Sequence, residues 1–464
     1  MASQLLSLLL LLAASSTILP VVSAAPCPPL KSPIPPSQDP WYTAPPSFAS
    51  AAPGSVLRLR RAPGNLTAIY GSAAAYNILY RTTDSQYKPA WAVTTLFIPA
   101  TNGTTTTTVR TSTPRRETVD VNKTACTASV SSSTAKLLSY QIPYDSADVD
   151  ASPSYALYAS TVQSANATYG PILSAGWFLN IPDYEGPLAS FTAGVMSGHA
   201  TIDSIRAVVS LLTTSDWLLG LPQCFEDVRY AMWGYSGGAL ASEWAAELQV
   251  QYAPELVFAG AALGGLTPNV TSVLETINGG LAAGLAPSSI LGLTSQYPDV
   301  QELLLGRLKA AGPYNATGFL SARDMSLAQA EVAFAFHDIG AYFVDGLSDI
   351  ITGPEVDRII FSDGIMGYHG VPQMPLFAYK AIQDEISPVA DTDKLVGEYC
   401  NMGANILYQR NTVGGHTAEA TNGFQAALEW LTSVLEGTYA QEYNSTGCTV
   451  EQVTVRLNTS PIKF

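Results

Sequence analysis

The stretch 231-AMWGYSGGALASEW-244 places Ser236 between glycines, directly after an apolar run. The pattern G-x-S-x-G is common by itself, because turns favour both glycine and serine. Here Val228 to Trp233 predicts a strand before the serine, and Gly237-Gly238-Ala239 opens a predicted helix after it. Strand, sharp turn and helix in this order form a nucleophile elbow, in which a strained serine backbone holds the hydroxyl clear of the sheet edge. The alternative interpretation is a serine in an ordinary tight turn.

Short β-rich runs alternate with helical runs around this stretch. The predicted strands are 137–144, 172–183, 228–234, 255–265, 374–382 and 404–411, and the predicted helices among them include 194–212 and 238–251. Such alternation indicates βαβ units and a mostly parallel sheet. Residues 78–98 instead alternate apolar and polar side chains around Asp84-Ser85, which predicts an antiparallel hairpin.

The regular alternation stops between about 267 and 370, where Ala-, Gly- and Leu-rich helical segments dominate. We therefore expect an α/β fold: a mostly parallel sheet with helices on both faces and an inserted helical cap or lid. The expected divisions are a signal peptide (1–24), an N-terminal arm with the first part of the core (25–266), the cap (267–370) and the rest of the core (371–464).

The composition is that of a globular protein with a sizeable core: 47% of the 464 residues are hydrophobic and 13% are charged. A formal net charge of −15 argues against nucleic acid or an anionic membrane as the main partner. The leucine-rich run from Leu5 ends in the small residues Val22-Ser23-Ala24, as a secretory signal peptide does. The same run is just long enough for a membrane anchor. We expect cleavage and secretion.

Two further patterns suit an extracellular protein. Five scattered cysteines without a C-x-x-C pair favour disulfides in an oxidising compartment over a zinc site, and their odd number leaves a free thiol or an undetected pairing. Glycosylation sequons arise by chance in Ser/Thr-rich sequence, but eight of them with a signal peptide predict a glycoprotein. The sequons are at Asn65, Asn102, Asn122, Asn166, Asn269, Asn315, Asn444 and Asn458.

A nucleophilic serine needs a base to remove its proton and a carboxylate to orient that base. In an enzyme with a nucleophile elbow, the acid and the histidine follow the serine along the chain. His199 precedes Ser236, and His337 and His369 lie in the expected cap or at its edge. His416 lies on a Gly-rich loop after the strand 404–411, so it is the expected base; the alternative is a surface histidine.

The expected acid is Asp384, which follows the predicted strand 374–382. There it can meet a histidine on the next loop. The adjacent Glu385 is expected to point away, and Asp391 and Asp393 are expected in a later turn or helix start. Many Asp residues at strand ends only cap turns, but placement and chain order favour Asp384.

A tetrahedral intermediate needs two backbone N–H donors for its oxyanion. Gly237, the residue after the serine, is expected to provide one. The other should come from a loop after a neighbouring strand, and Asp183 at the end of 172–183 is the candidate; an ordinary turn is the equal alternative. This chemistry requires no metal and no cofactor.

A series of segments resembles the fungal secretory lipase family, the family of yeast lipase A. In chain order from about Asp39 to Cys448 they are DPWYT, YRTTDSQ, SPSYAL, PDYEG, GYSGG, QYAPEL, NGG, QDEISP, CNMGANI and GGHTAE. The resemblance implies an α/β-hydrolase fold with a helical lid between the serine and the acid. It implies the triad Ser236, Asp384 and His416, with oxyanion donors at Gly237 and Asp183.

The same resemblance implies hydrolysis or transfer of fatty acyl esters, with the acyl chain in a tunnel under the lid. The Gly/Ala/Leu stretch 279–293 is the expected lining, and ordinary helix packing is its equal alternative. It also implies a disulfide between Cys400 and Cys448. A second family bridge is expected to be absent, because Ala151 stands at one of its cysteine positions, and Cys27, Cys126 and Cys224 are additional.

The expected function is therefore a secreted triacylglycerol lipase that works through an acyl-enzyme. Its partners would be a lipid or ester substrate and, transiently, a lipid–water interface, with no nucleic acid; no oligomeric state is indicated. The chain ends 16 residues after Cys448, where the family continues into a flap, so a less covered site favouring shorter or bulkier esters is expected. The alternatives are a carboxylesterase, acetyl esterase or acyltransferase for such esters, and a non-catalytic binding protein that retains the fold.

Overall fold

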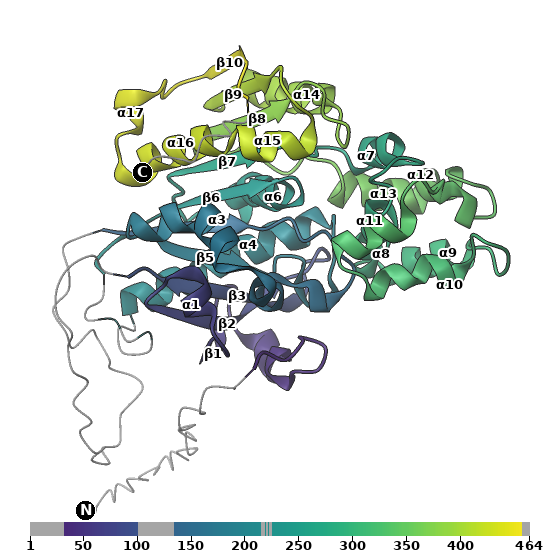
Figure 1. Cartoon of the computed structure of the whole chain (residues 1–464), viewed down its shortest axis with the longest axis horizontal. Coiled ribbons are helices and arrows are strands. Elements are labelled where there is room, and N and C mark those ends of the chain that lie inside the picture. Colours follow the sequence, from purple (N-terminus) through teal and green to yellow (C-terminus); the bar gives the residue numbers. More distant parts are fainter. Residues whose placement is uncertain (1–31, 101–133, 215–218, 220, 222–224, 457–464) are drawn as a thin grey trace, which may run out of the picture.

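A ten-stranded sheet forms the centre of the chain (Figure 1). The structure is a computed structural model that describes residues 32–100, 134–214, 219, 221 and 225–456. The strands are β1 (Val56–Arg61), β2 (Ala74–Thr83), β3 (Pro89–Ile98), β4 (Ala135–Gln141), β5 (Phe178–Pro182), β6 (Val228–Tyr235), β7 (Gly260–Gly264), β8 (Leu376–Ala381), β9 (Ile406–Asn411) and β10 (Cys448–Val453). Their order across the sheet is β1-β2-β3-β5-β4-β6-β7-β8-β9-β10.

The strands from β5 to β10 in this order run parallel, and β1, β2 and β3 pair antiparallel. The prediction of a mostly parallel sheet is confirmed. The predicted hairpin is also present, because β2 pairs with β3 around a turn at 84–88. One crossing matters for the site: β4 precedes β5 in the chain but lies between β5 and β6 in the sheet.

Helices cover both faces of the sheet, as predicted. Alternate residues of a strand point to opposite faces: in β6, Met232 packs with the helices of one layer and Trp233 with those of the other. One layer contains α4 (Gly194–Thr214), α6 (Gly237–Tyr252) and α14 (Val389–Asn401), and the other contains α1 (Leu66–Tyr70), α3 (Val162–Ser174) and α16 (Phe424–Glu436). Within the described residues, the other core α-helices are α2 (Pro153–Ala156), α15 (His416–Asn422) and α17 (Tyr439–Glu442).

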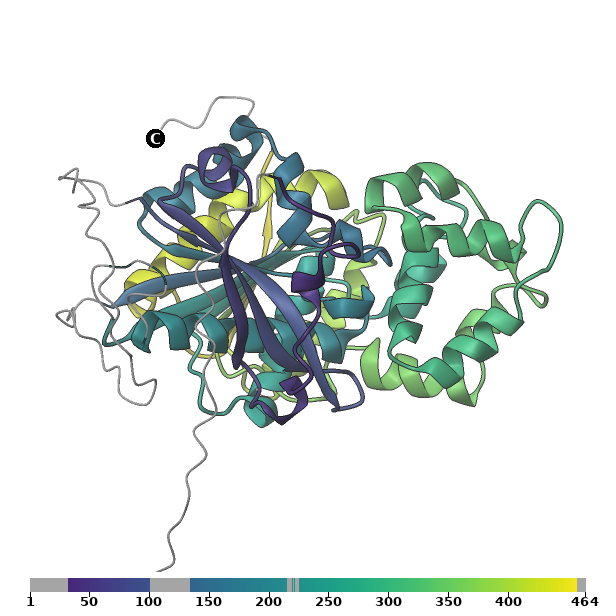
Figure 2. The ribbon, with the colours of Figure 1, turned by 90° about the horizontal axis from the view of Figure 1, so that it is seen from below.

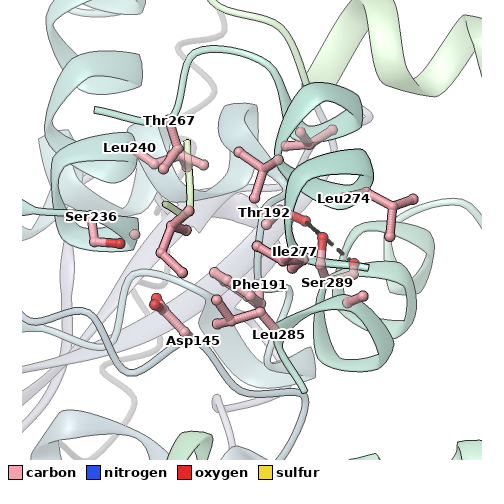
Figure 3. A pocket seen from close by; sticks show the side chains of 15 residues that line it. Asp145, Phe191, Thr192, Ser236, Leu240, Thr267, Leu274, Ile277, Leu285 and Ser289 are labelled. Carbon is pink, nitrogen blue, oxygen red and sulfur yellow. Dashed lines mark hydrogen bonds between the residues drawn. The ribbon is translucent and has the colours of Figure 1, made fainter. Parts of the chain in front are cut away.

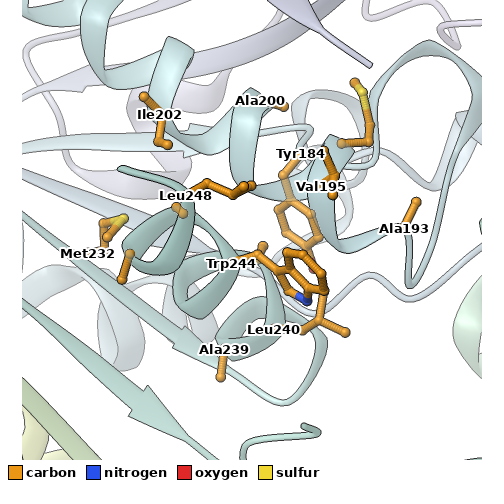
Figure 4. Close-up of a cluster of buried hydrophobic side chains, with 14 of the residues drawn as sticks. Tyr184, Ala193, Val195, Ala200, Ile202, Met232, Ala239, Leu240, Trp244 and Leu248 are labelled. Atoms are coloured by element: carbon orange, nitrogen blue, oxygen red, sulfur yellow. The ribbon is translucent and has the colours of Figure 1, made fainter. Parts of the chain in front are cut away.

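Two glycines let α4 approach α6 closely (Figure 4). A Cβ at Gly194 would overlap the indole ring of Trp244, and one at Gly198 would overlap the Trp244 carbonyl group. Trp244 is 1% exposed and packs in this contact with Leu248. The contact fixes α6 on the sheet, and α6 begins directly after Ser236.

Between β7 and β8 the chain forms only helices, which lie to one side of the sheet (Figure 2). They are α7 (Val270–Ile277), α8 (Leu285–Ser295), α9 (Pro298–Gly306), α10 (Ala316–Leu320), α11 (Leu327–Phe334), α12 (Ser348–Ile351) and α13 (Pro354–Asp363), with short 3-10 turns among them. We call this segment, residues 265–375, the cap. It separates the strand next to the serine from the strand that precedes Asp384.

Several predictions fall outside the described residues. They are the signal peptide over 1–24, the residues Cys27, Cys126 and Cys224, and the sequons at Asn102, Asn122 and Asn458. Among the described helices, none is both long enough and apolar enough to cross a bilayer.

Candidate active site

Ser236 lies in the turn between β6 and α6, with φ 54° and ψ −123°. A positive φ is uncommon for a residue with a side chain and marks backbone strain. The turn is held in place because the Ser236 N–H donates to the Gly264 carbonyl at the end of β7 (2.9 Å). The flanking glycines are needed for close approach, since a Cβ at Gly234 would overlap the Gly238 carbonyl. Strand, strained turn and helix therefore have the geometry of a nucleophile elbow.

The three side chains predicted to act together lie in one hydrogen-bonded line. His416 Nε2 is 2.8 Å from Ser236 Oγ, and His416 Nδ1 is 2.7 Å from Asp384 Oδ2. Asp384 follows β8 and His416 follows β9, and these strands are parallel neighbours whose ends meet at the same edge of the sheet. The Asp384 side chain is fully buried and that of His416 is 9% exposed. This is the arrangement of a Ser-His-Asp triad.

Asp384 is held as a carboxylate by four hydrogen bonds. Oδ2 also accepts from Lys380 Nζ (2.9 Å), and Oδ1 accepts from the N–H groups of Ile386 (2.9 Å) and Ser387 (2.8 Å). Burial alone would raise the pKa of Asp384, but the hydrogen bond from His416 and the charge of Lys380 lower it to about 2. Asp384 is therefore ionised wherever the imidazole needs a counter-charge.

Lys380 is a site residue that the sequence analysis missed. Its side chain is fully buried on β8, and Nζ also donates to the Leu266 carbonyl (2.7 Å). Burial lowers its pKa, while Asp384 opposes that effect. The sequence did contain a signal for it: Lys380 is a single charged residue inside an apolar strand, four positions before Asp384. A lysine buried in such a strand needs a charged partner nearby.

The prediction that Glu385 points away from the histidine is wrong. Glu385 Oε2 accepts the backbone N–H of His416 (2.8 Å), and a Cβ at Gly415 would overlap this carboxylate. The backbone N–H groups of Ile386 and Ser387 both donate to Asp384 Oδ1. The turn that these bonds form directs Glu385 towards the start of α15. Asp384 therefore binds the imidazole ring of His416, and the adjacent Glu385 binds its backbone N–H.

The other histidines have separate partners. His199 is fully buried, with Nδ1 3.3 Å from the Thr83 carbonyl, and burial lowers its pKa to about 3. His337 Nδ1 lies 3.0 Å from the Tyr342 hydroxyl, and His369 Nδ1 lies 3.2 Å from Glu247. None of the three lines the cavity beside Ser236.

The prediction that Asp183 supplies the second oxyanion donor is wrong. Its N–H donates to the Val93 carbonyl on β3 (2.8 Å), so this N–H belongs to the sheet. Its carboxylate accepts from the N–H (2.7 Å) and hydroxyl (2.5 Å) of Ser154 at the start of α2. The reason is the order of the strands: Asp183 follows β5, and β4 lies between β5 and the serine strand β6.

Asp145, which follows β4, is the residue that lies beside the serine on this side, because it lines the cavity together with Ser236 and Gly237. A Cβ at Gly237 would overlap Asp145 Oδ1, and this oxygen has no hydrogen-bond partner among the described residues. The residue is 4% exposed, with φ 44°. Burial, with the nearby Glu331, raises the pKa of Asp145 to about 7, so its carboxyl group can carry a proton at neutral pH. The sequence signal was Asp145 directly after the predicted strand 137–144, but only the order of the strands in the sheet distinguishes it from the Asp183 of PDYEG.

A cavity of about 40 Å³ adjoins the serine (Figure 3). Its far wall is formed by cap residues of α7 and α8, including Leu274, Ile277 and Leu285. The predicted lining stretch 279–293 therefore contributes in part, through residues from Leu285 onward. The apolar wall suits the acyl portion of an ester.

The family model described as secretory lipase matches residues 153–442. The chain belongs to the secretory lipase family. It is 50% identical to the trichothecene C-3 esterase of Fusarium sporotrichioides, over 91% of this chain and 88% of that protein. It is 40% identical to a probable trichothecene esterase of Stachybotrys chartarum, over 92% of this chain and 81% of that protein. The closed-state crystal structure of Candida antarctica lipase A is similar, with a TM-score of 0.74 and 26% identity over 93% of this chain and 92% of that one.

These similarities confirm the predicted secretory lipase family and the α/β-hydrolase fold. The relatives of this secretory lipase family member are lipases and esterases. The chain is accordingly a carboxylic ester hydrolase, and its substrate is a lipid or another ester.

The predicted disulfide of this family member is confirmed. Cys400 and Cys448 are bonded, with their Cα atoms 5.8 Å apart. The bond joins the end of α14 to the first residue of β10. Because β10 pairs only with β9 among the described strands, the disulfide secures an edge strand.

The described sequons of the secretory lipase fall into two groups. Asn65, Asn166 and Asn444 are exposed. Asn269 and Asn315 are partly buried, and their side-chain oxygens accept N–H groups at the starts of α7 and α10. Glycosylation at each of these positions stays a prediction.

Proposed function

We propose that the chain hydrolyses carboxylic esters through an acyl-enzyme on Ser236. The observation that carries this proposal is the line of contacts from Ser236 Oγ through His416 to Asp384, at 2.8 and 2.7 Å. His416 takes the serine proton as Oγ attacks the ester carbonyl, and gives it to the departing alcohol. Water then attacks the acyl-enzyme with His416 again as base, which releases the acid. The ionised Asp384 stabilises the imidazolium and fixes its tautomer.

The oxyanion of each tetrahedral intermediate would lie between Gly237 and Asp145. Gly237 is the first residue of α6, so its N–H has no partner within the helix. The helix N-terminus also favours negative charge. The protonated carboxyl group of Asp145, with Oδ1 beside Gly237, is the second donor. Donors already oriented in a buried site stabilise the developing charge without reorganisation.

Our first substrate proposal is a trichothecene ester. It is supported by the two relatives described as trichothecene esterases, at 50% and 40% identity over more than nine-tenths of this chain. The matched regions cover more than nine-tenths of this chain, so they include residues of both the core and the cap. Ser236 would then attack the acyl carbonyl while the trichothecene leaves as the alcohol.

The second substrate proposal is a triacylglycerol, with transient contact to a lipid–water interface. It is supported by the similarity to Candida antarctica lipase A. An alcohol in place of water would give acyl transfer by the same steps. We also propose that the protein is secreted and glycosylated, which the leader-like residues 1–24, the sequons and the description of the family as secretory support.

A labelling experiment tests the catalytic proposal. An alkyl p-nitrophenyl phosphonate should modify Ser236, identified by peptide mass spectrometry, and abolish p-nitrophenyl butyrate hydrolysis. Ser236→Ala should lose both labelling and activity, while Ser210→Ala, an exposed serine on α4, should keep them. Absence of labelling in the folded protein would instead support a binding protein that retains the fold.

Substrate class is tested with the same preparation. Hydrolysis of a trichothecene bearing an acetyl ester at C-3 is compared with that of tributyrin and triolein at equal ester concentration. Faster turnover of the trichothecene ester supports the first proposal, and faster turnover of triolein supports the second.

A further inference from the structure

Two apolar cavities meet inside the cap. The first adjoins Ser236, and the second lies among the cap helices; each has a volume of about 40 Å³. Val270, Leu274, Ala286 and Ser289 belong to the walls of both cavities. These shared residues form a boundary between the two cavities. Whether this boundary is open or closed determines the length of the acyl group that fits beside Ser236.

A pair of hydroxyl groups stands at this boundary. Thr192 Oγ1 lies 2.9 Å from Ser289 Oγ and donates to the Ser289 carbonyl (3.3 Å). Thr192 lines only the first cavity and Ser289 lines both, and Figure 3 shows the pair across the pocket from Ser236. An acyl chain that passed this point would separate the hydroxyls and place methylene groups against them, which leaves partly buried polar atoms without these partners.

The loop that carries Thr192 is hydrogen-bonded to α8 and packed against it. Thr192 has φ 66°, an outlying conformation for a β-branched residue, and such strain persists only where the surroundings impose it. Beside it, Ser190 Oγ lies 2.7 Å from Ser295 Oγ and accepts from Gln296 Nε2 (2.8 Å). A Cβ at Gly292 would overlap the backbone of Phe191, so the loop lies directly on the helix.

The volume of the first cavity indicates what fits in front of the pair. The cavity of about 40 Å³ is small, and the pair lies across it from Ser236. A short acyl group such as acetyl or butyryl fits in front of the pair, whereas a long chain has to pass it.

We propose that the Thr192–Ser289 pair is the specificity-determining element that restricts the acyl group of the substrate to short chains. This rests on the proposed acylation of Ser236. With the pair closed, acetyl and butyryl esters bind fully, and an octanoyl ester would have to break it. With the hydroxyls removed, the two cavities join into one apolar channel from Ser236 into the cap.

The test measures kcat/KM for p-nitrophenyl acetate, butyrate and octanoate. The wild type is expected to prefer acetate or butyrate over octanoate. In Thr192→Ala/Ser289→Ala, the octanoate-to-acetate ratio should rise about tenfold, the scale on which apolar pockets discriminate methylenes. The control is Ser190→Ala/Ser295→Ala, which removes the neighbouring hydroxyl pair of the same loop and helix but touches neither cavity. Its ratio should equal that of the wild type.

A second readout does not depend on turnover. Butyl and octyl phosphonates are compared by their rates of labelling Ser236, and the double variant should gain labelling by the octyl compound alone. If Thr192→Ala/Ser289→Ala does not fold, Ser289→Ala alone serves, with a smaller rise expected. Equal ratios in wild type and folded variant, or a wild type that already cleaves octanoate as fast as acetate, overturn the inference. If no ester is cleaved and Ser236 is not labelled, the proposed function itself has failed.

Discussion

Lys380 Nζ lies 2.9 Å from Asp384 Oδ2, the same oxygen that receives His416 Nδ1 at 2.7 Å. A buried cation and the histidine therefore share one carboxylate oxygen. The lysine offsets part of the negative charge that Asp384 presents to the imidazolium. This relationship links a residue outside the Ser-His-Asp line to the charge of Asp384, because Lys380 lowers the pKa of that carboxyl group.

Replacing Lys380 with methionine should shift the pH profile. Without the cation, the pKa of Asp384 rises, because the charge of Lys380 is one of the interactions that lower it. The acid limb of kcat/KM should move up by about one pH unit. The control Lys88→Met removes an exposed lysine and the same formal charge, and should leave the limb in place. An unmoved limb in folded Lys380→Met contradicts the assignment, whatever happens to its melting temperature.

Asp145 should give the pH profile of kcat/KM an alkaline limb. Its raised pKa of about 7 means that the carboxyl group is protonated and able to donate below that pH. Above it, the carboxylate repels the oxyanion, so kcat/KM of the wild type should fall as the pH rises through about 7. Asp145→Asn carries an amide donor at every pH and should lose this limb.

Asp145→Ala should lose about 10²–10³-fold in kcat, the usual effect of removing one oxyanion donor. Asp148→Asn, on the same loop but outside the cavity wall, should retain the profile of the wild type. An alkaline limb that survives in Asp145→Asn would assign it to another group.

The Cys400–Cys448 disulfide should stabilise the fold without affecting the chemistry. The closed loop spans 48 residues, so the chain-entropy model predicts a loss of about 4 kcal/mol in the free energy of unfolding when it is removed. The variant Cys400→Ser/Cys448→Ser should show this loss in urea unfolding, with kcat/KM at 25 °C close to that of the wild type. An unchanged unfolding midpoint would mean that β10 contributes little to stability.

The contact between α4 and α6 should tolerate no added methyl group. Gly198→Ala places a Cβ against the Trp244 carbonyl and should destabilise the protein by about 1–3 kcal/mol. Gly397→Ala, in α14, meets open space and should stabilise by up to about 1 kcal/mol, because alanine favours a helix. Thermal unfolding of the two variants gives the comparison, and equal shifts would contradict it.

Local sequence patterns were sufficient for the residues at the ends of single strands. A strand, a glycine-flanked serine and a helix in this order favour a nucleophile elbow over an ordinary turn, so Ser236 could be predicted without knowledge of the rest of the fold. Asp384 and His416 each follow a recognisable strand, and β8 and β9 are consecutive strands along the chain and neighbours in the sheet. For these three residues, the order of the strands along the chain therefore matches the order of the strands in the sheet.

On the other side of Ser236, the order of the strands in the sheet differs from their order along the chain. Because β4 crosses over to lie between β5 and β6, the loop carrying Asp145 reaches Gly237, whereas the N–H of Asp183 is paired within the sheet. The contact between Thr192 and Ser289 likewise joins residues 97 positions apart. The sequence determined the elbow and the residues in line with it, since these depend on local backbone geometry. Only the tertiary structure decided that Asp145 lies beside Gly237 and that Thr192 meets Ser289 at the end of the pocket. Both contacts depend on which strands and helices become neighbours.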